Sequence, residues 1–291
     1  MRARWLVLCF ACGPKQAAVD GDLGRLDGAV LESSGLIASA RHPGLLWTHG
    51  DSGTGNVLFG VRPSGELLTR VQIGGAPLRD WEDITADGEG HLWLSDLGNN
   101  VNDRQDLALV RIPEPGPSGE QTVEPDRVLR VRYPDQTSFP PVDTLNYDAE
   151  AVFFADGRLY VLTKHRSDQK TTLYRSPGLE GDVILELLSS FDLGGPADRT
   201  GGKATSAALH PDGRLLAVLA YHAVFLFERP ESGDDWLSRP VHQIPLVQSI
   251  TRQCEAIAWL GDALVITNEE GRMFRIDAPR LRATPFPDVR P

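Results

Sequence analysis

The chain has 291 residues, and 40 acidic against 29 basic residues give it a formal net charge of −11. A protein that neutralises nucleic-acid phosphates needs a basic face, so this charge argues against nucleic acid as a partner. The same charge opposes electrostatic binding to anionic lipid. No apolar run in the sequence reaches the 18 or more residues of a membrane-spanning helix. Contact with a membrane is therefore expected only through the N-terminal segment.

That segment, MRARWLVLCFAC, has the layout of an export signal. Two arginines form a basic start, a short apolar stretch follows, and a small residue precedes Cys12. It resembles a bacterial lipoprotein signal, in which the cysteine after the cleavage site is lipidated. We therefore expect a signal over residues 1–12 that ends at the lipidated Cys12, and a polar tether over residues 13–24. The predicted location is a bacterial cell envelope, as a membrane-anchored lipoprotein. The alternatives are a secreted protein and a cytosolic protein with a frayed N-terminus.

The rest of the chain is organised by an internal repeat. Five segments share an apolar strand, a tight turn and a second apolar strand, and they begin at Ser33, Trp81, Ala149, Thr205 and Cys254. Further strand-like runs follow in each unit, separated by turn dipeptides such as Asp-Gly and Ser-Gly. No long stretch has the apolar spacing of an amphipathic helix. Repeated units of four strands and about 40–50 residues are typical of β-propeller blades.

We therefore predict an all-β fold, a single β-propeller over residues 25–284 with five four-stranded antiparallel blades, followed by a Pro-rich tail at 285–291. The last repeat lacks an outer strand, so the segment Arg25–Leu31 is expected to supply it and close the ring. Six blades are the alternative, if residues 104–145 form a blade rather than a long outer hairpin with a Pro-rich loop. A β-sandwich would not predict a polar residue repeated at one strand position. The chain is expected to be a monomer.

The repeat brings polar residues together at the central channel, because the first strand of each blade lines it. Aligned on the turns, the equivalent positions are Ser34, Glu82, Glu150, Ser206 and Glu255. Loops that open on the same face predict a ligand-binding rim of Asp51, Asp80, Asp96, Asn99, Asp148, His222 and Glu269. The cationic residues expected near this rim are Arg79, Lys164, His165, Arg166 and Lys203.

Carboxylates that face one another across a narrow tunnel repel and lose hydration. Either some of them are protonated, or a cation neutralises them. A ligand set made only of oxygens suits Ca²⁺ and offers no preference to Zn²⁺, which favours His and Cys. Ca²⁺ is thus the one cofactor expected. In the alternative, the glutamates accept hydrogen bonds from neighbouring backbone N–H groups and fix the inner strands.

Short motifs carry a resemblance to known families. The strings ESSGL, RDWEDI, DLGNN, DAEAV, LYVLTK and CEAIAW resemble a family of uncharacterised bacterial secreted or lipoprotein β-propellers, from Leu31 to Ile276. The order Ser, Glu, Glu, Ser, Glu is also similar to the calcium-activated apyrases, five-bladed propellers that hold Ca²⁺ in the tunnel and hydrolyse nucleoside diphosphates. That similarity implies Ca²⁺ ligands at Ser34, Glu82, Glu150, Ser206 and Glu255. A further similarity extends to phytase-like esterase propellers.

Three functions are compatible with these features. The first is an envelope propeller whose channel face binds a small molecule or an envelope protein, with Ca²⁺ in the tunnel. The second is a Ca²⁺-dependent hydrolase of phosphoanhydride, phosphoester or lactone-type ester bonds. Its general base would be Glu82 or Glu150, and Lys164 or His165 would steady the leaving group. The third is a scaffold with a structural channel. Binding is favoured because no complete catalytic constellation is visible in the sequence.

The remaining aromatic residues and one motif have structural interpretations. Trp47, Trp93 and Tyr160 are expected to pack between blades, and Trp236, in an acidic loop, is expected to be exposed. The motif Gly50-Asp51-Ser52-Gly53 is expected to be a turn rather than part of a protease site, since that site needs a His base and a buried Asp from a different fold.

Overall fold

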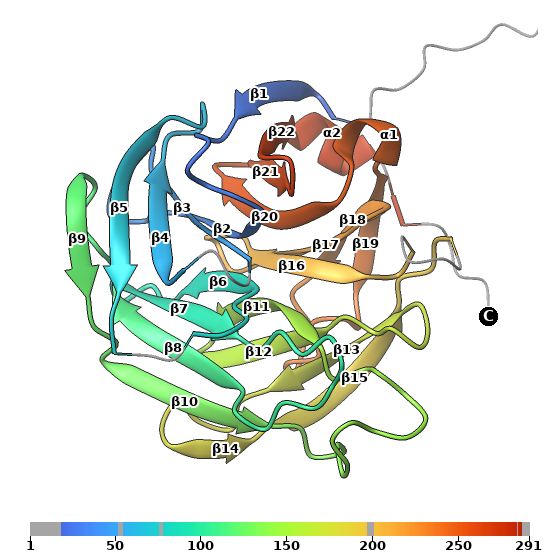
Figure 1. Cartoon of the computed structure of the whole chain (residues 1–291). Coiled ribbons are helices and arrows are strands. Elements are labelled where there is room, and N and C mark those ends of the chain that lie inside the picture. The colour runs from blue at the N-terminus through green and yellow to red at the C-terminus, as the bar shows by residue number, and fades with distance from the viewer. Residues whose placement is uncertain (1–18, 52–54, 76–77, 197–200, 284, 287–291) are drawn as a thin grey trace, which may run out of the picture.

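The sequence repeats fold into antiparallel sheets that stand side by side around a central axis (Figure 1). The computed structural model describes residues 19–51, 55–75, 78–196, 201–283 and 285–286. Over these residues the fold is an all-β propeller of five blades, as predicted. The expected signal with Cys12, residues 13–18 of the expected tether, the Ser52-Gly53 part of the turn motif and residues 287–291 lie outside the described residues.

In each blade four strands follow one another from the axis outward. Blade 1 contains β2 (Ser33–Ala38), β3 (Leu46–Gly50), β4 (Val57–Val61) and β5 (Leu67–Ile73). Blade 2 contains β6 (Asp83–Ala86), β7 (His91–Asp96), β8 (Ala108–Pro113) and β10 (Arg127–Arg132). Blade 3 contains β11 (Ala149–Ala155), β12 (Arg158–Thr163), β13 (Lys170–Arg175) and β15 (Glu186–Asp192). Blade 4 contains β16 (Ala204–Leu209), β17 (Leu215–Ala220), β18 (Ala223–Glu228) and β19 (Pro240–Pro245). Blade 5 contains β20 (Cys254–Leu260), β21 (Ala263–Asn268), β22 (Arg272–Ile276) and β1 (Gly21–Arg25).

Residues 104–145 form no sixth blade. They supply the outer strands β8 and β10 of blade 2, and between them β9 (Gly119–Val123) crosses to blade 1 and pairs in parallel with β5. A second added strand, β14 (Asp182–Ile184), leaves blade 3 and pairs in parallel with β10. Blade 2 is thus joined to blades 1 and 3 at its outer edge as well as through the cores.

The ring is closed by the N-terminal strand, but four residues earlier than predicted. β1 pairs antiparallel with β22, with Gly21 opposite Arg275 and Arg25 opposite Arg272. The predicted strand Arg25–Leu31 instead turns, because the N–H of Val30 donates to the Asp27 carbonyl. Leu26 and Val30 enter the core between blades 5 and 1, whereas Leu31 is exposed. Residues 21–24, which were expected in the tether, therefore belong to the propeller.

Large side chains fill the spaces between blades. Trp47, Trp93 and Tyr160 are fully buried, as predicted. Trp236 is only 1% exposed, so its predicted exposure is wrong. Its ring makes an edge contact with Phe153, with ring centroids 5.8 Å apart. The loop is held there by the acids beside Trp236, which bond to side chains of blade 3.

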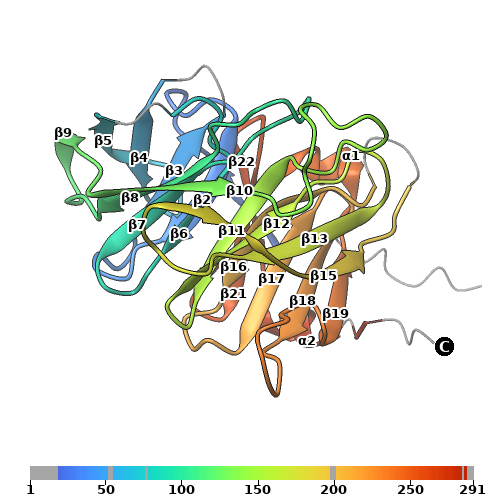
Figure 2. The same ribbon diagram turned by 90° about the horizontal axis from the view of Figure 1, so that it is seen from below.

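Two short helices, α1 (Gln248–Thr251) and α2 (Ala278–Ala283), flank the strands of blade 5. In the side view they lie at opposite ends of the propeller axis (Figure 2). The end with α1 is the one at which the inner strand β20 begins. Within the described part of the chain, no helix is both long and apolar enough to cross a membrane.

Candidate functional site: an acidic mouth of the central channel

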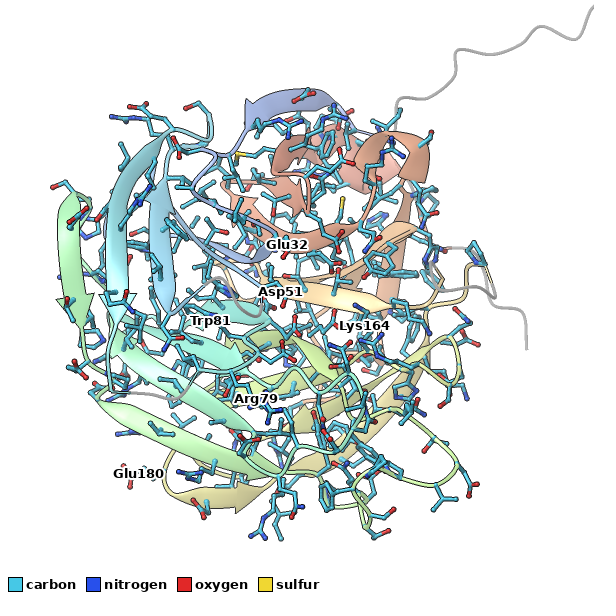
Figure 3. The ribbon with its side chains drawn as sticks, viewed as in Figure 1. Glu32, Asp51, Arg79, Trp81, Lys164 and Glu180 are labelled. Atoms are coloured by element: carbon cyan, nitrogen blue, oxygen red, sulfur yellow. The ribbon has the colours of Figure 1, made fainter. Side chains whose placement is uncertain are left out.

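A hollow of about 220 Å³ opens at the end of the axis where the inner strands begin. We call it the acidic mouth. Its lining residues are Glu32, Ser34, Asp51, Glu82, Asn100, Glu150, Lys164, Arg166, Tyr221, Glu255 and Glu269. Figure 3 shows Glu32, Asp51 and Lys164 close to the axis, whereas Glu180 lies at the outer edge of the molecule. The predicted convergence of residues from different blades at the channel is thus observed for most of the repeated positions.

A local irregularity places these side chains. The register of β2, β11, β16 and β20 shifts at the second residue, where a β-bulge occurs in each inner strand. The bulged residues are Ser34, Glu150, Thr205 and Glu255. A bulge leaves one residue outside the regular pairing and redirects its side chain. In blades 1, 3 and 5 the bulged residue lines the channel mouth, whereas Thr205 does not. Glu82 reaches the mouth from just before β6, whose pairing with β7 has no such shift.

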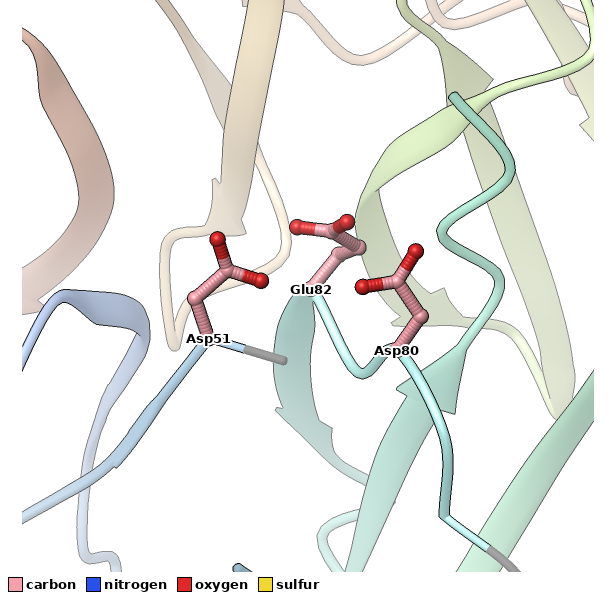
Figure 4. Close-up of side chains that lie close together, drawn as sticks. All are labelled: Asp51, Asp80 and Glu82. Atoms are coloured by element: carbon pink, nitrogen blue, oxygen red, sulfur yellow. The ribbon is translucent and has the colours of Figure 1, made fainter. Parts of the chain in front are cut away.

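Glu82 is the centre of the carboxylate cluster. Its carboxylate lies within 4.8 Å of those of Asp51 and Asp80, and the three groups face one another in Figure 4. In a second set, carboxylate oxygens of Glu82, Asp148 and Glu150 also lie within 4.8 Å of one another. Two groups of three carboxylates therefore share Glu82.

Gly98 leaves room for the close approach of the Glu82 and Asp80 carboxylates. A side chain at Gly98 would place its Cβ 2.3 Å from Glu82 Oε1 and 2.5 Å from Asp80 Oδ2. Any larger residue would displace the two carboxylates. The hydroxyl of Ser34 donates to Glu82 Oε2 at 3.2 Å and to the Glu82 carbonyl at 3.0 Å, which fixes Glu82 against blade 1.

A cationic side chain stands on the opposite wall. Lys164 is 7% exposed, and its Nζ lies 2.5 Å from Glu150 Oε2 and 2.9 Å from the Tyr221 hydroxyl. Tyr221 in turn donates to Glu255 Oε1 at 2.8 Å. The result is a continuous chain of contacts across blades 3, 4 and 5. Sequence reasoning missed Tyr221, although it follows β17 as Lys164 follows β12, and named its neighbour His222 instead.

Arg166 completes the charged wall. Its guanidinium pairs with Asp148, lies 3.5 Å from Glu150 Oε1, and donates to Asn100. Both cations of the acidic mouth therefore contact Glu150. Glu82, whose carboxylate lies within 4.8 Å of that of Glu150, connects these paired charges to Asp51 and Asp80.

Burial and mutual repulsion raise the pKa values of several acids. Burial, followed by the charge of Glu150, raises the pKa of Glu82 well above its ordinary value. Burial and the charge of Asp51 raise the pKa of Asp80 to about 6. Burial and the charge of Glu255 raise the pKa of Glu269 to about 7. The cluster thus holds protons more tightly than isolated carboxyls do, and a bound cation would relieve the same repulsion.

On the other wall the paired charges dominate. Burial alone would lower the pKa of Lys164, but the charges of Glu150 and Glu255 raise it well above the ordinary value. Lys164 is therefore an ammonium ion across the ordinary pH range. It can stabilise negative charge and cannot act as a neutral nucleophile.

Several predicted residues lie outside the acidic mouth. Asp96 is buried and pairs with Arg104, with Oδ2 2.9 Å from Nη2. Asn99 holds a loop, since its Oδ1 accepts the N–H of Arg104. His165 contacts Asp168 and Thr172 with its two ring nitrogens, and His222 contacts the Leu193 carbonyl. These side chains organise the loops behind the mouth rather than its surface.

Ser206 does not reach the acidic mouth either, because the alignment in blade 4 is one residue out of register. The turn between β16 and β17 is longer than the two-residue turn between β11 and β12, so alignment on turns shifts this strand. The bulged position is Thr205, whose hydroxyl donates to the Cys254 carbonyl. A shift of one residue exchanges the two sides of a strand.

Ser206 belongs instead to a buried group around Asp83, which sequence reasoning missed. The Asp83 carboxylate accepts hydrogen bonds from the N–H groups of Ile84, Val152 and Ala207 and from the Ser206 hydroxyl. The Ser206 oxygen also accepts the N–H of Ile257. Asp83 thus links blades 2 to 5 directly below the mouth, and the signal for it was the second acid of the WEDI string.

Comparison with known proteins supports the architecture. No family model matches the chain, and no curated protein matches it. An aldose sugar dehydrogenase of Streptomyces coelicolor, solved in its PQQ-bound form, is 11% identical, with 88% of this chain and 96% of that chain covered and a TM-score of 0.52. The Cps50 (Swd1) β-propeller domain of Myceliophteria thermophila is 12% identical, with 84% and 82% covered and a TM-score of 0.39. A Bacteroides uniformis protein provisionally assigned as a 6-phosphogluconolactonase is 16% identical, with 84% and 66% covered and a TM-score of 0.41.

At these identities the likeness shows the propeller fold alone. The resemblance to uncharacterised bacterial lipoprotein propellers and to apyrases stays a prediction.

Proposed function

We propose that the acidic mouth binds a divalent cation of the Ca²⁺ type and, through it, a ligand at the channel face. The observation that carries this proposal is that Glu82 belongs to two groups of three carboxylates whose oxygens lie within 4.8 Å. Ca²⁺ is bound by six to eight oxygens in flexible geometry, which a mouth built from several loops can supply. The described lining contains no His or Cys, so Zn²⁺ would find none of the ligands it favours.

The charges around the mouth favour Asp51, Asp80 and Glu82 as the residues that hold the cation. Lys164 and Arg166 contact Glu150 and would repel a second cation there. Asp51, Asp80 and Glu82 form a group of three carboxylates with closely spaced oxygens. A cation held by these three acids would bind a negative group of a ligand directly, while Lys164 and Arg166 would add positive potential without leaving Glu150 and Asp148. A small molecule or an envelope protein with carboxylate or phosphate groups fits this arrangement.

The test is the effect of Ca²⁺ on thermal unfolding of the wild type and two variants. A cation at one hundred times its Kd stabilises the folded state by about 2.7 kcal/mol, which corresponds to a rise of roughly 5–10 °C in Tm for a domain of this size. Glu82→Gln should melt higher than the wild type in EDTA, because repulsion is relieved, and should show no response to Ca²⁺. Glu180→Gln is the matched control, since that side chain is 82% exposed at the outer edge.

Equal melting temperatures with and without Ca²⁺ for the wild type would refute the proposal. A calcium response that Glu82→Gln retains would place the cation elsewhere.

A second candidate function is favoured because Lys164 and Glu82 line the same hollow. In this candidate the chain is a cation-dependent hydrolase of phosphoanhydride, phosphoester or lactone-type ester bonds. Glu82, whose pKa burial raises, would accept a proton from the attacking water, and Lys164 would stabilise the charge on the leaving group. Turnover of one of these substrates with Ca²⁺, abolished in Glu82→Gln, would support it. Binding without turnover across the panel would leave the first function.

We also propose that the propeller is exported and anchored to a bacterial envelope membrane by a lipid on Cys12, with no nucleic-acid partner and as a monomer. The sequence of residues 1–12 supports this. Mass spectrometry of the mature N-terminus tests it: a diacylated or triacylated Cys12 is expected. An unmodified Met1 on the purified protein would refute the anchor, and a free Cys12 would favour secretion.

A further inference from the structure

A second and larger hollow lies at the opposite end of the inner strands. Its volume is about 600 Å³, and all five blades contribute to its wall. We call it the apolar chamber. Residues of the strand ends that line it include Leu36, Ile37, Ile84, Phe154, Leu209 and Trp259. The residues Glu82 and Ile84 flank Asp83, with Glu82 in the acidic mouth and Ile84 in the apolar chamber.

The Asp83 group separates the two hollows. Ile84 and Ala207 line the apolar chamber, and their N–H groups point away from it to the Asp83 carboxylate. These two N–H groups at the base of the chamber therefore already have hydrogen-bond acceptors within the protein. Apolar side chains such as Leu36, Ile84 and Trp259 supply most of the surface that is left to a ligand.

The basic side chains at the rim of the chamber have acidic partners. Arg229 Nη2 lies 2.5 Å from Asp156 Oδ2. Arg111 donates to Asp126 at 2.8 Å through Nε. His210 lies 2.8 Å from Asp212, and Glu89, which also lines the chamber, is exposed to solvent. The two arginines of the described rim are therefore already engaged by carboxylates, and an anionic ligand would have to break one of these pairs.

We propose that the apolar chamber is a binding site for an uncharged, mainly apolar organic molecule of drug-like size. Its volume lies in the range of about 300–1,000 Å³ that is usual for ligand sites. Water gains few hydrogen bonds in an apolar cavity, so displacing it by an apolar molecule is favourable. The site is independent of the cation proposed for the acidic mouth and uses none of its side chains.

The probe for this site is N-phenylnaphthylamine, a neutral molecule whose fluorescence rises in apolar surroundings. We expect saturable binding with one molecule per chain. Ala86→Phe and Ala208→Phe fill the chamber from blades 2 and 4, where both alanines are half-buried in its wall. Each should weaken binding at least tenfold. Ala29→Phe is the matched control, since Ala29 is also half-buried but lies outside the chamber wall, and it should bind as the wild type does.

Two further measurements separate the possible outcomes. Anilinonaphthalene sulfonate, the sulfonated analogue of the probe, should bind at least tenfold more weakly, and equal or tighter binding would overturn the uncharged class. Binding that does not saturate, or that both chamber-filling variants retain, would overturn the site itself. Thermal melting shows whether each variant folds, and Ala86→Leu repeats the test with a smaller side chain if the Phe variants do not. Glu82→Gln should bind the probe unchanged, so failure of the calcium proposal leaves this test valid.

Discussion

The buried carboxylate of Asp83 offers the sharpest test of how the blades are held together. In Asp83→Asn one carboxylate oxygen becomes an amide NH₂. Oδ2 accepts the N–H groups of Val152 and Ala207, and Oδ1 accepts from Ile84 and Ser206. If the NH₂ replaces Oδ2, the N–H groups of Val152 and Ala207 both lose their acceptor. If it replaces Oδ1, the N–H of Ile84 loses its acceptor, whereas the Ser206 hydroxyl can turn and accept from the NH₂.

Each buried donor without an acceptor costs about 1–3 kcal/mol. The less costly orientation leaves only the Ile84 N–H unpaired, but the bonds from Val152 and Ala207 then lose the added strength of an ionised acceptor, about 1 kcal/mol each, so the total is about 3–5 kcal/mol. In the native chain burial of the carboxylate is costly, and it raises the pKa of Asp83. The neutral amide avoids this cost, so part of the loss is offset. We expect a net destabilisation of about 2–4 kcal/mol. For a domain of this size, that corresponds to a decrease of roughly 5–15 °C in Tm.

Thermal and urea unfolding of the wild type, Asp83→Asn and Asp212→Asn measure this effect. Asp212 also accepts a backbone N–H, from Arg214 at 2.9 Å, but in an exposed turn. Its substitution should change the unfolding free energy by less than about 1 kcal/mol. An Asp83→Asn variant that melts within the same narrow range as the control would contradict the view that this carboxylate joins four blades.

Two other consequences concern the acidic mouth. Lys164→Met removes the ammonium that contacts Glu150 and Tyr221. Breaking such a buried pair should lower the unfolding free energy by roughly 3–5 kcal/mol. Urea unfolding at pH 8 measures this change, and an unchanged midpoint would contradict it. In EDTA, the raised pKa values of Asp80, about 6, and Glu269, about 7, mean that the folded chain binds more protons than the unfolded chain. Stability should therefore be greater at pH 5.5 than at pH 8 and be lost as the pH rises through 6–7; a higher Tm at pH 8 would show the opposite sign.

The architecture could be predicted because each blade repeats the same local pattern. Strand alternation, Asp-Gly turns and a polar residue near the start of each inner strand carry enough information to count five blades. The closing strand could not be placed correctly, because Gly21–Arg25 has little hydrophobic character and is a strand only through pairing with β22. Tertiary pairing decided this element, and local propensity did not.

Only some residues of the site could be predicted, because the others depend on contacts between blades. Ser34, Glu82, Glu150 and Glu255 are equivalent positions near the start of the inner strands, so their convergence follows from the repeat. The turn after the inner strand varies in length between blades, so alignment on turns could fail for one blade, as it did for Ser206. The roles of Tyr221, Gly98 and Asp83 depend on contacts between blades, which no pattern within one blade reveals. Trp236 is a similar case, because its burial depends on contacts of its loop with blade 3.

The pairing of β1 with β22 sets the order of events when the chain is made. The first strand of the propeller leaves the ribosome some 250 residues before its partner, since Gly21 lies opposite Arg275. Until then β22 does not exist, and blade 5 cannot be completed. The ring can therefore close only after residues 272–276 have been made, however early the other blades fold.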